Sequence, residues 1–330
     1  MMKSDYTAEI FNITSEKHFE DLALKFFNLQ LTENRIYRDY CTLLGRTGQN
    51  VRALDDIPYL PIDFFKNYDI INNGLKTEKV FKSSGTEHVN RRSKHLVADL
   101  SLYEKSFSTA FELFIGNVES MHFFSLLPNY ETNPESSLIY MVDKLISNSA
   151  NQKKTAYQAN ETLINELTNI NAEGLSNVLF GVSFALLDLA DRFNLDLKHT
   201  ILIETGGMKG RRNEITREEL HARLKNRLNP KRIFSEYGMS ELMSQAYADE
   251  SGNFKCPPWM KVRIRDLHDP LSPSNKGTGG IDIIDLANIY SCPFISTSDL
   301  GKMNENGSFE VLGRVDYSDI RGCNLLYESL

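Results

Sequence analysis

Short apolar runs alternate with amphipathic stretches along the middle of the chain. The apolar runs end in polar or glycine-containing turns, which is the pattern of buried strands. They are residues 121–128 (MHFFSLLP), 177–180 (NVLF) and 200–207 (TILIETGG). Within residues 185–193 and within residues 216–228, the apolar residues recur with the period of a helix. Thr216 and Glu219 have the spacing of a capping box. This alternation predicts an α/β layer structure.

The two ends of the chain have different patterns. Near the N-terminus, Ser15 is expected to open one helix, and Thr32 to cap a second that ends at Gly45. Near the C-terminus, short strands separated by Pro, Gly and Asn turns predict a β-rich subdomain. We therefore expect a helical segment, an α/β core, a β-rich subdomain and a short tail. Their predicted bounds are 1–75, 76–255, 256–322 and 323–330.

Composition narrows the class of protein. The chain has 330 residues and a net charge of −7, which argues against nucleic acid as the main partner. No run approaches the roughly 20 apolar residues of a membrane span, and the N-terminus lacks a secretory pattern. The cysteines are far apart and show no CxxC spacing, so we expect no disulfide framework or zinc site and a cytoplasmic location. They are Cys41, Cys256, Cys292 and Cys323.

The first candidate for chemistry is the stretch 80–95, VFKSSGTEHVNRRSKH. A short strand is followed by Ser83-Ser84-Gly85-Thr86 and then by basic residues. Hydroxyl groups and backbone N–H groups around a glycine can converge on phosphate oxygens. Taken alone, the segment is better explained as a solvated turn, and the stretch is not a Walker loop.

Two further stretches carry isolated acidic residues. In 232–247 (RIFSEYGMSELMSQAY), Glu241 follows a strand and a glycine turn, where it fits either a metal ligand or a charge at a helix N-terminus. In 293–301 (PFISTSDLG), Asp299 is expected at a strand end, where it fits either a ribose ligand or an ordinary turn. Each motif is weak alone.

The order of the motifs is specific. Ser-Ser-Gly-Thr, Tyr-Gly-Met-Ser-Glu, Ser-Asp-Leu-Gly and Gly-Arg-Val-Asp follow one another as in the adenylate-forming enzymes. The text between them, including ETGGMKGRRNEITREELH and GRVDYSDIRGCNLL, resembles the LuxE-type acyl-protein synthetases over roughly residues 60 to 330. The resemblance implies the large-domain architecture of adenylate-forming enzymes, with a core that binds nucleotide and acyl group.

The resemblance also implies an ATP- and Mg²⁺-dependent ligase of the long-chain fatty acid–protein type. A carboxylic acid, by this expectation a fatty acid, attacks ATP to give an acyl-adenylate and pyrophosphate; a thiol then takes the acyl group and AMP leaves. An acyl reductase or another acyl-accepting protein is the implied partner. A carboxylic acid is ionised at neutral pH, so the first step needs alignment and charge neutralisation and no general base.

The motifs assign roles to phosphate- and metal-binding residues. By family match, Ser83, Ser84, Gly85 and Thr86 would hold the β- and γ-phosphates. Glu241 would bind Mg²⁺, a cation that prefers oxygen ligands.

The remaining motif positions are implied to bind the nucleoside. Asp299 would hold the ribose hydroxyls, and Arg314 would lie near the ribose or a phosphate. Tyr237 and Gly238 would flank the adenine on one side. The nucleotide-binding residues implied in the two glycine-containing turns are Gly206, Gly207, Tyr237, Gly238, Met239 and Ser240.

Two departures from the family pattern affect the expectations. The usual phosphate-loop lysine is absent, and Arg91, Arg92 or Lys94 is left to supply its charge. By the same resemblance, the eight residues after Gly322 are too few for the mobile C-terminal domain that follows Gly-Arg-x-Asp in relatives, so we expect that domain to be missing. Cys323 stands where acyl-protein synthetases carry their acyl-accepting cysteine; from local sequence alone it fits a structural role.

Two rival functions remain open at this point. Ser183, between a strand and a helix, resembles a nucleophile elbow, and a serine acyltransferase or hydrolase would need partners such as Asp266 and His268. Alternatively, the altered phosphate loop and the absent domain suit a non-catalytic subunit that binds nucleotide or a partner protein.

Overall fold

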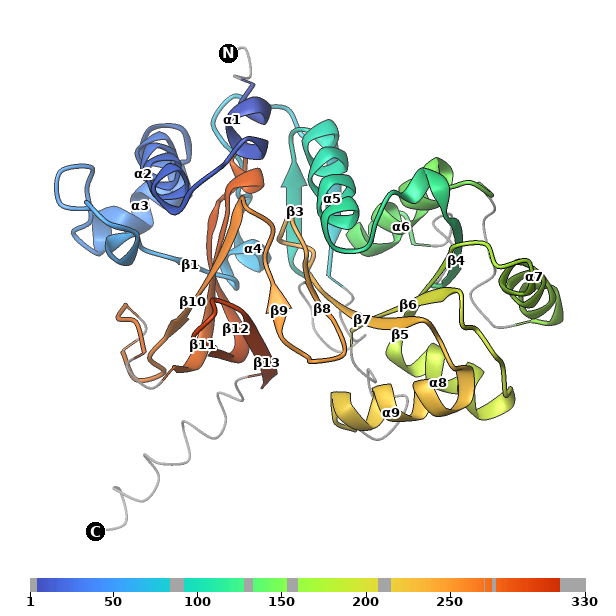
Figure 1. Cartoon of the computed structure of the whole chain (residues 1–330). Coiled ribbons are helices and arrows are strands. Elements are labelled where there is room, and N and C mark those ends of the chain that lie inside the picture. Colours follow the sequence, from blue (N-terminus) through green and yellow to red (C-terminus); the bar gives the residue numbers. More distant parts are fainter. Residues whose placement is uncertain are drawn as a thin grey trace, which may run out of the picture.

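The computed structural model describes residues 5–83, 92–127, 133–152, 160–206, 215–269, 271–274 and 277–314. Within these residues, eleven strands form one sheet, and β2 and β3 pair separately (Figure 1). The strands are β1 (Leu60–Pro61), β2 (Lys79–Lys82), β3 (Lys94–Val97), β4 (His122–Leu126), β5 (Asn177–Val182), β6 (Thr200–Thr205), β7 (Arg232–Tyr237), β8 (Ala246–Ala248), β9 (Phe254–Lys255), β10 (Met260–Arg265), β11 (Thr278–Asp285), β12 (Phe294–Met303) and β13 (Phe309–Arg314). The α-helices are α1 (Thr7–Phe11), α2 (Glu16–Glu33), α3 (Arg35–Leu43), α4 (Phe64–Asn67), α5 (Leu100–Phe114), α6 (Ser137–Asn148), α7 (Glu161–Ala172), α8 (Ser183–Arg192) and α9 (Arg217–Leu228). Short 3₁₀ turns span Leu54–Asp56, Val118–Ser120 and Leu286–Asn288.

Strands β4 to β7 form a parallel half-sheet with helices on both of its faces. In Figure 1, α5 and α6 lie above this half and α8 and α9 lie below it. Every residue of β5 and β6 is buried, as strands covered on both faces require. The predicted buried strands are confirmed by β4, β5 and β6, and the predicted helices by α8 and α9. The side chain of Thr216 caps α9 by accepting the backbone N–H of Glu219 at 3.2 Å.

The N-terminal helices confirm only part of what the sequence predicted for them. Ser15 caps α2, as predicted. The prediction that Thr32 caps the next helix is wrong, because α2 runs on to Glu33 and Asn34 caps α3. The hydroxyl group of Thr32 donates to the carbonyl of Leu29 inside α2, so it is already satisfied there. Asparagine is at least as good an N-cap as threonine, which explains the later start.

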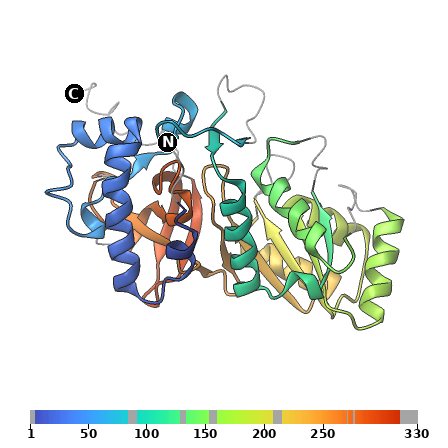
Figure 2. The ribbon, with the colours of Figure 1, turned by 90° about the horizontal axis from the view of Figure 1, so that it is seen from above.

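The helical segment packs on the β-rich part of the sheet. The ring of Phe294 on β12 lies 6.4 Å from that of Phe27 and 5.7 Å from that of Tyr37. Strand β1 pairs with β12 in parallel, with Leu60 opposite Ile295. Figure 2 shows α2 and α3 beside these strands. The sheet is also continuous from β8 through β9 to β13, and the predicted domain boundaries stay predictions.

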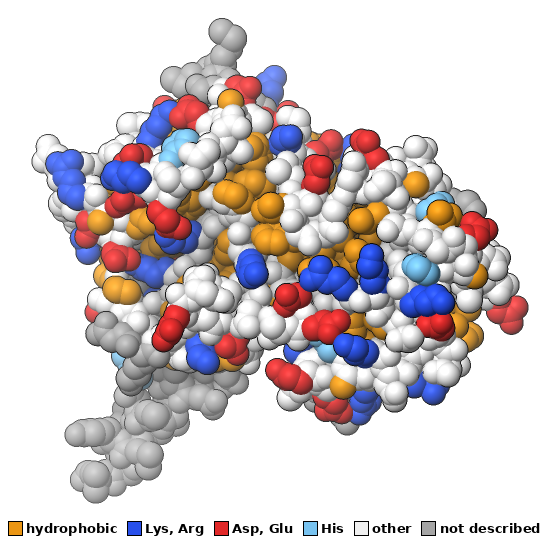
Figure 3. All heavy atoms as spheres, viewed as in Figure 1, with side chains coloured by type: hydrophobic (Ala, Val, Ile, Leu, Met, Phe, Trp, Pro, Cys, Tyr) orange, Lys and Arg blue, Asp and Glu red, His pale blue; other side chains and the backbone are white. Residues whose placement is uncertain are grey.

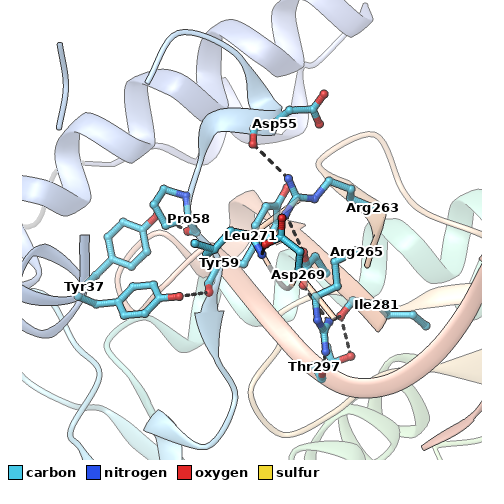
Figure 4. A network of polar contacts seen from close by, with 12 residues as sticks. Tyr37, Asp55, Pro58, Tyr59, Arg263, Arg265, Asp269, Leu271, Ile281 and Thr297 are labelled. Carbon is cyan, nitrogen blue, oxygen red and sulfur yellow. Dashed lines mark hydrogen bonds and ion pairs between the residues drawn. The ribbon is translucent and has the colours of Figure 1, made fainter. Parts of the chain in front are cut away.

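A buried ionic network fixes the β10–β12 region. Asp282 is fully buried and accepts hydrogen bonds from Arg263 at 2.8 Å and Arg265 at 2.9 Å. Arg265 also donates to the carbonyl of Thr297 at 2.7 Å, toward which it points in Figure 4. A Cβ atom at Gly280 would lie 2.3 Å from the guanidinium carbon of Arg265. Glycine is therefore needed at position 280 to admit the arginine.

The surface is mixed in character. Acidic and basic side chains are interspersed over the face seen in Figure 3, with apolar side chains between them near its centre. No helix in the described part of the chain is long and apolar enough to cross a membrane. Cys41 and Cys292 are buried thiols and Cys256 is half-buried.

Candidate active site

The turn that follows β7 is anchored by two buried side chains from other elements. Nδ1 of His95, on β3, donates to the carbonyl of Ser240 at 2.9 Å. Nδ2 of Asn288 donates to the carbonyl of Glu241 at 2.8 Å. Since two consecutive carbonyl groups are held in this way, the turn that carries Glu241 is fixed relative to β3 and the turn after β11.

The anchor His95 is an uncharged imidazole. A carbonyl oxygen only accepts hydrogen bonds, so Nδ1 of His95 must carry the proton. Burial lowers the pKa of His95 to about 4, although the carbonyl of Ser240 and the side chain of Asn288 oppose this shift. The anchor therefore holds the turn without adding positive charge at neutral pH.

Glu241 is buried beside the start of the predicted phosphate loop. Burial raises the pKa of its carboxyl group, while a hydrogen bond from Ser93 and the charge of Arg314 partly offset that rise. The N–H of Ser93 donates to the hydroxyl oxygen of Ser83 at 3.1 Å, and the N–H of Ser83 donates to the carbonyl of Ser93 at 3.0 Å. The predicted metal ligand and the first residue of the predicted phosphate loop therefore share Ser93 as a neighbour.

Asp299 connects the same turn to the β-rich part of the sheet. The hydroxyl of Tyr237 donates to its Oδ2 at 2.8 Å, and Nε of Arg314 donates to its Oδ1 at 3.3 Å. The prediction that Asp299 ends a strand is wrong: β12 continues to Met303, because it pairs with β11 on one side and β13 on the other. Arg314 is the cross-strand neighbour of Asp299 on β13.

The ring of Tyr237 belongs to an aromatic cluster. Its centroid lies 5.8 Å from that of Phe254 and 5.7 Å from that of Phe309. Burial, followed by the charge of Asp299, raises the pKa of the Tyr237 hydroxyl well above its usual value. The hydroxyl therefore stays protonated and acts as a donor to Asp299. Adenine contact by Tyr237 stays a prediction.

Two of the three candidates for the missing lysine charge lie in the described residues. Nε of Arg92 donates to the carbonyl of Ser83 at 2.5 Å, and its guanidinium group pairs with Glu135 at 3.3 Å. Lys94 instead pairs with Asp69 at 2.5 Å. Arg92 is thus the described candidate that touches the predicted phosphate loop.

A second carboxylate lies beneath the turn after β7. Glu236 accepts a short hydrogen bond from the hydroxyl of Thr205, its neighbour on β6. Burial, together with the nearby charge of Glu204, raises the pKa of Glu236 to about 7, and the hydrogen bond from Thr205 opposes the shift. A Cβ atom at Gly238 would lie 2.5 Å from Oε1 of Glu236. Glycine at 238 therefore leaves room for this carboxylate oxygen.

Glu204 lies on the face of the sheet opposite to Glu236, and neighbouring polar side chains hold its carboxylate in place. Its carboxylate accepts from the hydroxyl of Ser183 at 2.7 Å and lies 3.7 Å from both Arg217 and His221. Burial opposes ionisation of Glu204, but hydrogen bonds from His221, Ser235 and Ser183 bring its pKa below the usual value. The buried carboxylate is therefore compensated by several donors.

The serine-nucleophile alternative finds no support in this arrangement. The hydroxyl of Ser183 is buried, and its oxygen lies 2.7 Å from both Oε2 of Glu204 and the carbonyl oxygen of Gly206, so its single proton is already taken by one of these two acceptors. Asp266 and His268 follow β10, at the far end of the sheet from β5 and Ser183. The structure does not bring these three predicted partners together.

Several predicted site residues lie outside the described part of the chain. They are Ser84, Gly85, Thr86, Gly207 and Cys323, together with Arg91. The described turn residues Gly206 and Gly238 are exposed, Met239 and Ser240 are half-buried, and Gly206 has a φ of 70°. The roles assigned to all of these positions stay predictions.

Sequence reasoning missed His95, Ser93, Asn288, Thr205 and Glu236. Only Glu236 had a local signal, since it interrupts the apolar run RIFSEYG with a charge. The others are recognisable only through contacts between distant segments, such as the His95–Ser240 hydrogen bond.

One buried carboxylate, Glu241, suits the magnesium ion that the resemblance implies. Among the described residues, no three His, Cys, Asp or Glu side chains gather into a metal-binding group. Mg²⁺ is commonly held by one or two carboxylates plus phosphate oxygens and waters, so a single carboxylate such as Glu241 fits this mode. A bound cation would favour the ionised carboxylate of Glu241 and would therefore oppose the rise in its pKa that burial causes.

Comparisons with solved structures identify the fold. The chain matches ATP-bound MatB from Rhodopseudomonas palustris with a TM-score of 0.56 and 15% identity, over 74% of this chain and 49% of that chain. It matches O-succinylbenzoate coenzyme A synthetase (MenE) from Bacillus subtilis, in complex with AMP, with a TM-score of 0.52 and 17% identity, over 72% and 49%. The chain thus spans about half the length of these relatives. No protein-family model matches the sequence, and the search of curated proteins finds no significant match. The predicted fold is confirmed: this chain has the mixed α/β fold of the large domain of adenylate-forming enzymes.

Proposed function

We propose that this protein activates a carboxylic acid with ATP and Mg²⁺, forming an acyl-adenylate and releasing pyrophosphate. One observation carries the proposal: residues of four separate sequence motifs form a network of two chains of contacts around the turn at the carboxyl end of β7. The network runs from Ser83 through Ser93 to Glu241, and from Tyr237 through Asp299 to Arg314. The carboxyl ends of parallel strands are where α/β sheets bind their ligands.

The chemistry needs binding and charge compensation more than proton transfer. A carboxylic acid is already ionised at neutral pH, so the chain must bring two anions together. Arg314 suits this role, because its side chain is 84% exposed and its contact with Asp299 is long at 3.3 Å. The guanidinium group can therefore turn toward a phosphate without breaking a buried pair.

The other residues of the network serve orientation. Asp299 presents carboxylate oxygens that can accept both hydroxyl protons of a ribose, and Tyr237 holds one of those oxygens in place. His95 and Asn288 fix the backbone of the turn that carries Glu241. Glu241 would hold Mg²⁺, which would neutralise charge that builds up on the phosphates.

Solved relatives support the choice of nucleotide. MatB was crystallised with ATP, and MenE with AMP and with ATP and magnesium. These proteins share the fold of this chain at 15 to 17% identity. We propose the same nucleotide and metal, and a carboxylic acid substrate, for this chain.

The second half-reaction rests on the sequence resemblance. We infer that Cys323 takes the acyl group as a thioester and passes it to an acyl reductase or another acyl-accepting protein. The thiolate forms the C–S bond as the C–O bond to AMP breaks, so the thiol proton goes to solvent and AMP leaves.

The acceptor is tested by incubating the protein with ATP, Mg²⁺ and an acid that supports pyrophosphate release. Intact-mass measurement and peptide mapping are expected to find one acyl group on Cys323, released by hydroxylamine. The variant Cys323→Ser is expected to keep pyrophosphate release and lose the hydroxylamine-sensitive acyl group. Unchanged acylation of the variant would assign the acceptor elsewhere.

A further inference from the structure

A cleft lies between the N-terminal helical segment and β10, the last strand at the β-rich end of the sheet. It has about 250 Å³ of empty space and opens to solvent. Sites for drug-sized ligands have roughly 300 to 1,000 Å³, so this cleft suits a smaller molecule. The lining includes two leucines, two arginines, an aspartate and a tyrosine, which are Leu44, Leu271, Arg46, Arg263, Asp56 and Tyr59.

Arg46 is a half-buried cation in this lining. Its guanidinium group makes no ion pair or hydrogen bond with any residue that the structure describes. Asp56 is nearby but already occupied, because the backbone N–H groups of Arg52 and Ala53 donate to its Oδ2 at 3.0 and 3.1 Å. These hydrogen bonds lower the pKa of Asp56, and the charge of Arg46 adds a smaller effect. The guanidinium group of Arg46 is therefore free to bind a ligand in the cleft.

Arg263 is held in a fixed position but keeps unused donors. Its guanidinium group donates to the carboxylate of Asp282 at 2.8 Å and to the carbonyl of Asp55 at 3.2 Å. It also lies 4.3 Å from the centre of the Tyr59 ring. In Figure 4 the carboxylate of Asp55 points away from Arg263. A guanidinium group has five N–H donors, so these two bonds leave three without an acceptor in the described part of the chain, the buried Nε among them.

The charges at the cleft do not balance. Asp282 is paired with both Arg263 and Arg265, at 2.8 and 2.9 Å, so two arginines share one buried carboxylate. Arg46 adds one positive charge and Asp56 adds one negative charge. Three arginines and two aspartates leave a net charge of +1. One bound anion would compensate this excess, and its attraction is stronger in a partly buried cleft than in water.

We propose that this cleft binds a small molecule with a carboxylate or phosphate group and a short apolar part. Arg46 and the unused donors of Arg263 hold the anionic group, because a planar guanidinium group matches two oxygens of either anion. The apolar part lies against Leu44 and Leu271. The side chain of Leu271 is 46% exposed, so covering it removes apolar surface from water. The inference is independent of the proposed function.

The test is isothermal titration calorimetry of the full chain with three matched compounds. They are 4-methylpentanoate, 3-methylbutyl phosphate and the neutral 4-methylpentanamide. Saturable binding with a Kd of about 1 mM or less is expected for at least one of the two anions. The amide is expected to bind about tenfold more weakly or not at all, because it has no charge for the arginines. Comparison of the carboxylate with the phosphate identifies the anionic group.

Two variants assign this binding to the cleft. Arg46→Gln removes a charge, and Leu271→Glu places a competing carboxylate in the lining, so each is expected to raise the Kd about tenfold or more. Both variants are expected to fold, since the guanidinium group of Arg46 has no described partner and Leu271 is partly exposed. The matched control is Arg52→Gln, which changes an exposed arginine of the same segment that does not line the cleft. Its Kd is expected to equal that of the unmodified protein.

Three results would overturn the anion site. They are failure of both anions to bind, equal affinity for the amide, and an unchanged Kd in both Arg46→Gln and Leu271→Glu. The last result would place the binding elsewhere, since neither residue belongs to the network around Glu241 and Asp299. None of these measurements uses pyrophosphate release, so a failure of acid activation and a failure of the anion site are distinguishable.

Discussion

Tyr237 donates its hydroxyl proton to Asp299 across 2.8 Å, and this bond joins the end of the parallel half-sheet to the β-rich half. The two residues are 62 positions apart in the sequence. Asp299 receives a second donor, Arg314, at its other oxygen. The carboxylate predicted to bind ribose is therefore oriented by the motif predicted to flank adenine.

Replacing Tyr237 with phenylalanine tests this bond. Tyr237→Phe is expected to lower the free energy of unfolding by about 1 to 2 kcal/mol, because a buried acceptor loses its donor. The KM for ATP is expected to rise several-fold, since Asp299 loses its orientation. Urea denaturation and steady-state kinetics measure the two effects.

A matched control lies on β8, which pairs with β7. Tyr247 is also buried, but its hydroxyl has no partner among the described residues. Tyr247→Phe is expected to leave the unfolding free energy unchanged or raise it. Equal destabilisation by both substitutions would contradict the account of the Tyr237–Asp299 bond.

Glu236 is expected to make stability depend on pH. Its pKa is raised to about 7 by burial and by Glu204, so the folded protein holds this proton more tightly than the unfolded chain does. This contribution to stability is fully present below the unfolded pKa of about 4.5 and is lost as the pH rises through 7. The Glu236→Gln variant lacks the effect.

The measurement compares the two proteins by urea denaturation at pH 4 and pH 8. The unfolding free energy of Glu236→Gln minus that of the unmodified protein is expected to rise by about 3 kcal/mol across this range. A difference that stays constant with pH would show that Glu236 is not held in its neutral form.

His95 is expected to act in the opposite direction. Burial lowers its pKa to about 4, so the unfolded chain binds this proton more tightly between pH 4 and pH 6.5. The stability tied to neutral His95 is present above pH 6.5 and is lost as the pH falls toward 4, by about 3 kcal/mol. In His95→Gln, which keeps an amide donor for Ser240, unfolding free energy is expected to lose this acid-sensitive part. Denaturation series at pH 7 and pH 4 check it, and an identical acid response in both proteins would refute it.

Gly280 is expected to tolerate no side chain. A Cβ atom there would lie 2.3 Å from the guanidinium carbon of Arg265. The guanidinium group of Arg265 donates a hydrogen bond to the buried carboxylate of Asp282. Gly280→Ala is expected to lower the unfolding free energy by about 2 to 4 kcal/mol, through displacement of a buried charge from its partner. Calorimetric or urea unfolding measures the loss. A variant as stable as the unmodified protein would mean that Arg265 can move without cost.

The sequence predicted the elements whose patterns are local. The apolar runs that became β4, β5 and β6 are buried on both faces, so their composition alone is diagnostic. The prediction that Thr32 caps the second helix is wrong because Thr32 and Asn34, two good capping residues, lie two positions apart. Only tertiary packing chooses between them. The prediction that a strand ends at Asp299 is wrong because β12 pairs with both β11 and β13, and this pairing continues past a sequence that resembles a turn.

The candidate site was predictable where motifs name residues and not where distant segments meet. Motif order pointed to Tyr237, Glu241, Asp299 and Arg314, and the structure links them. The anchor His95 depends on a contact between residues 145 positions apart, which no local pattern encodes. The contact between Thr205 and Glu236 likewise depends on the β6–β7 register.

The most direct test of the central claim is ATP–pyrophosphate exchange dependent on a carboxylic acid. With ATP, Mg²⁺ and a suitable acid, the protein is expected to incorporate labelled pyrophosphate into ATP, and omission of the acid or the metal is expected to abolish exchange. Asp299→Asn and Glu241→Gln are expected to reduce kcat/KM for ATP by about tenfold or more while remaining folded. Exchange that proceeds equally without acid, or ATP cleavage to ADP and phosphate, would contradict the claim that this site forms an acyl-adenylate.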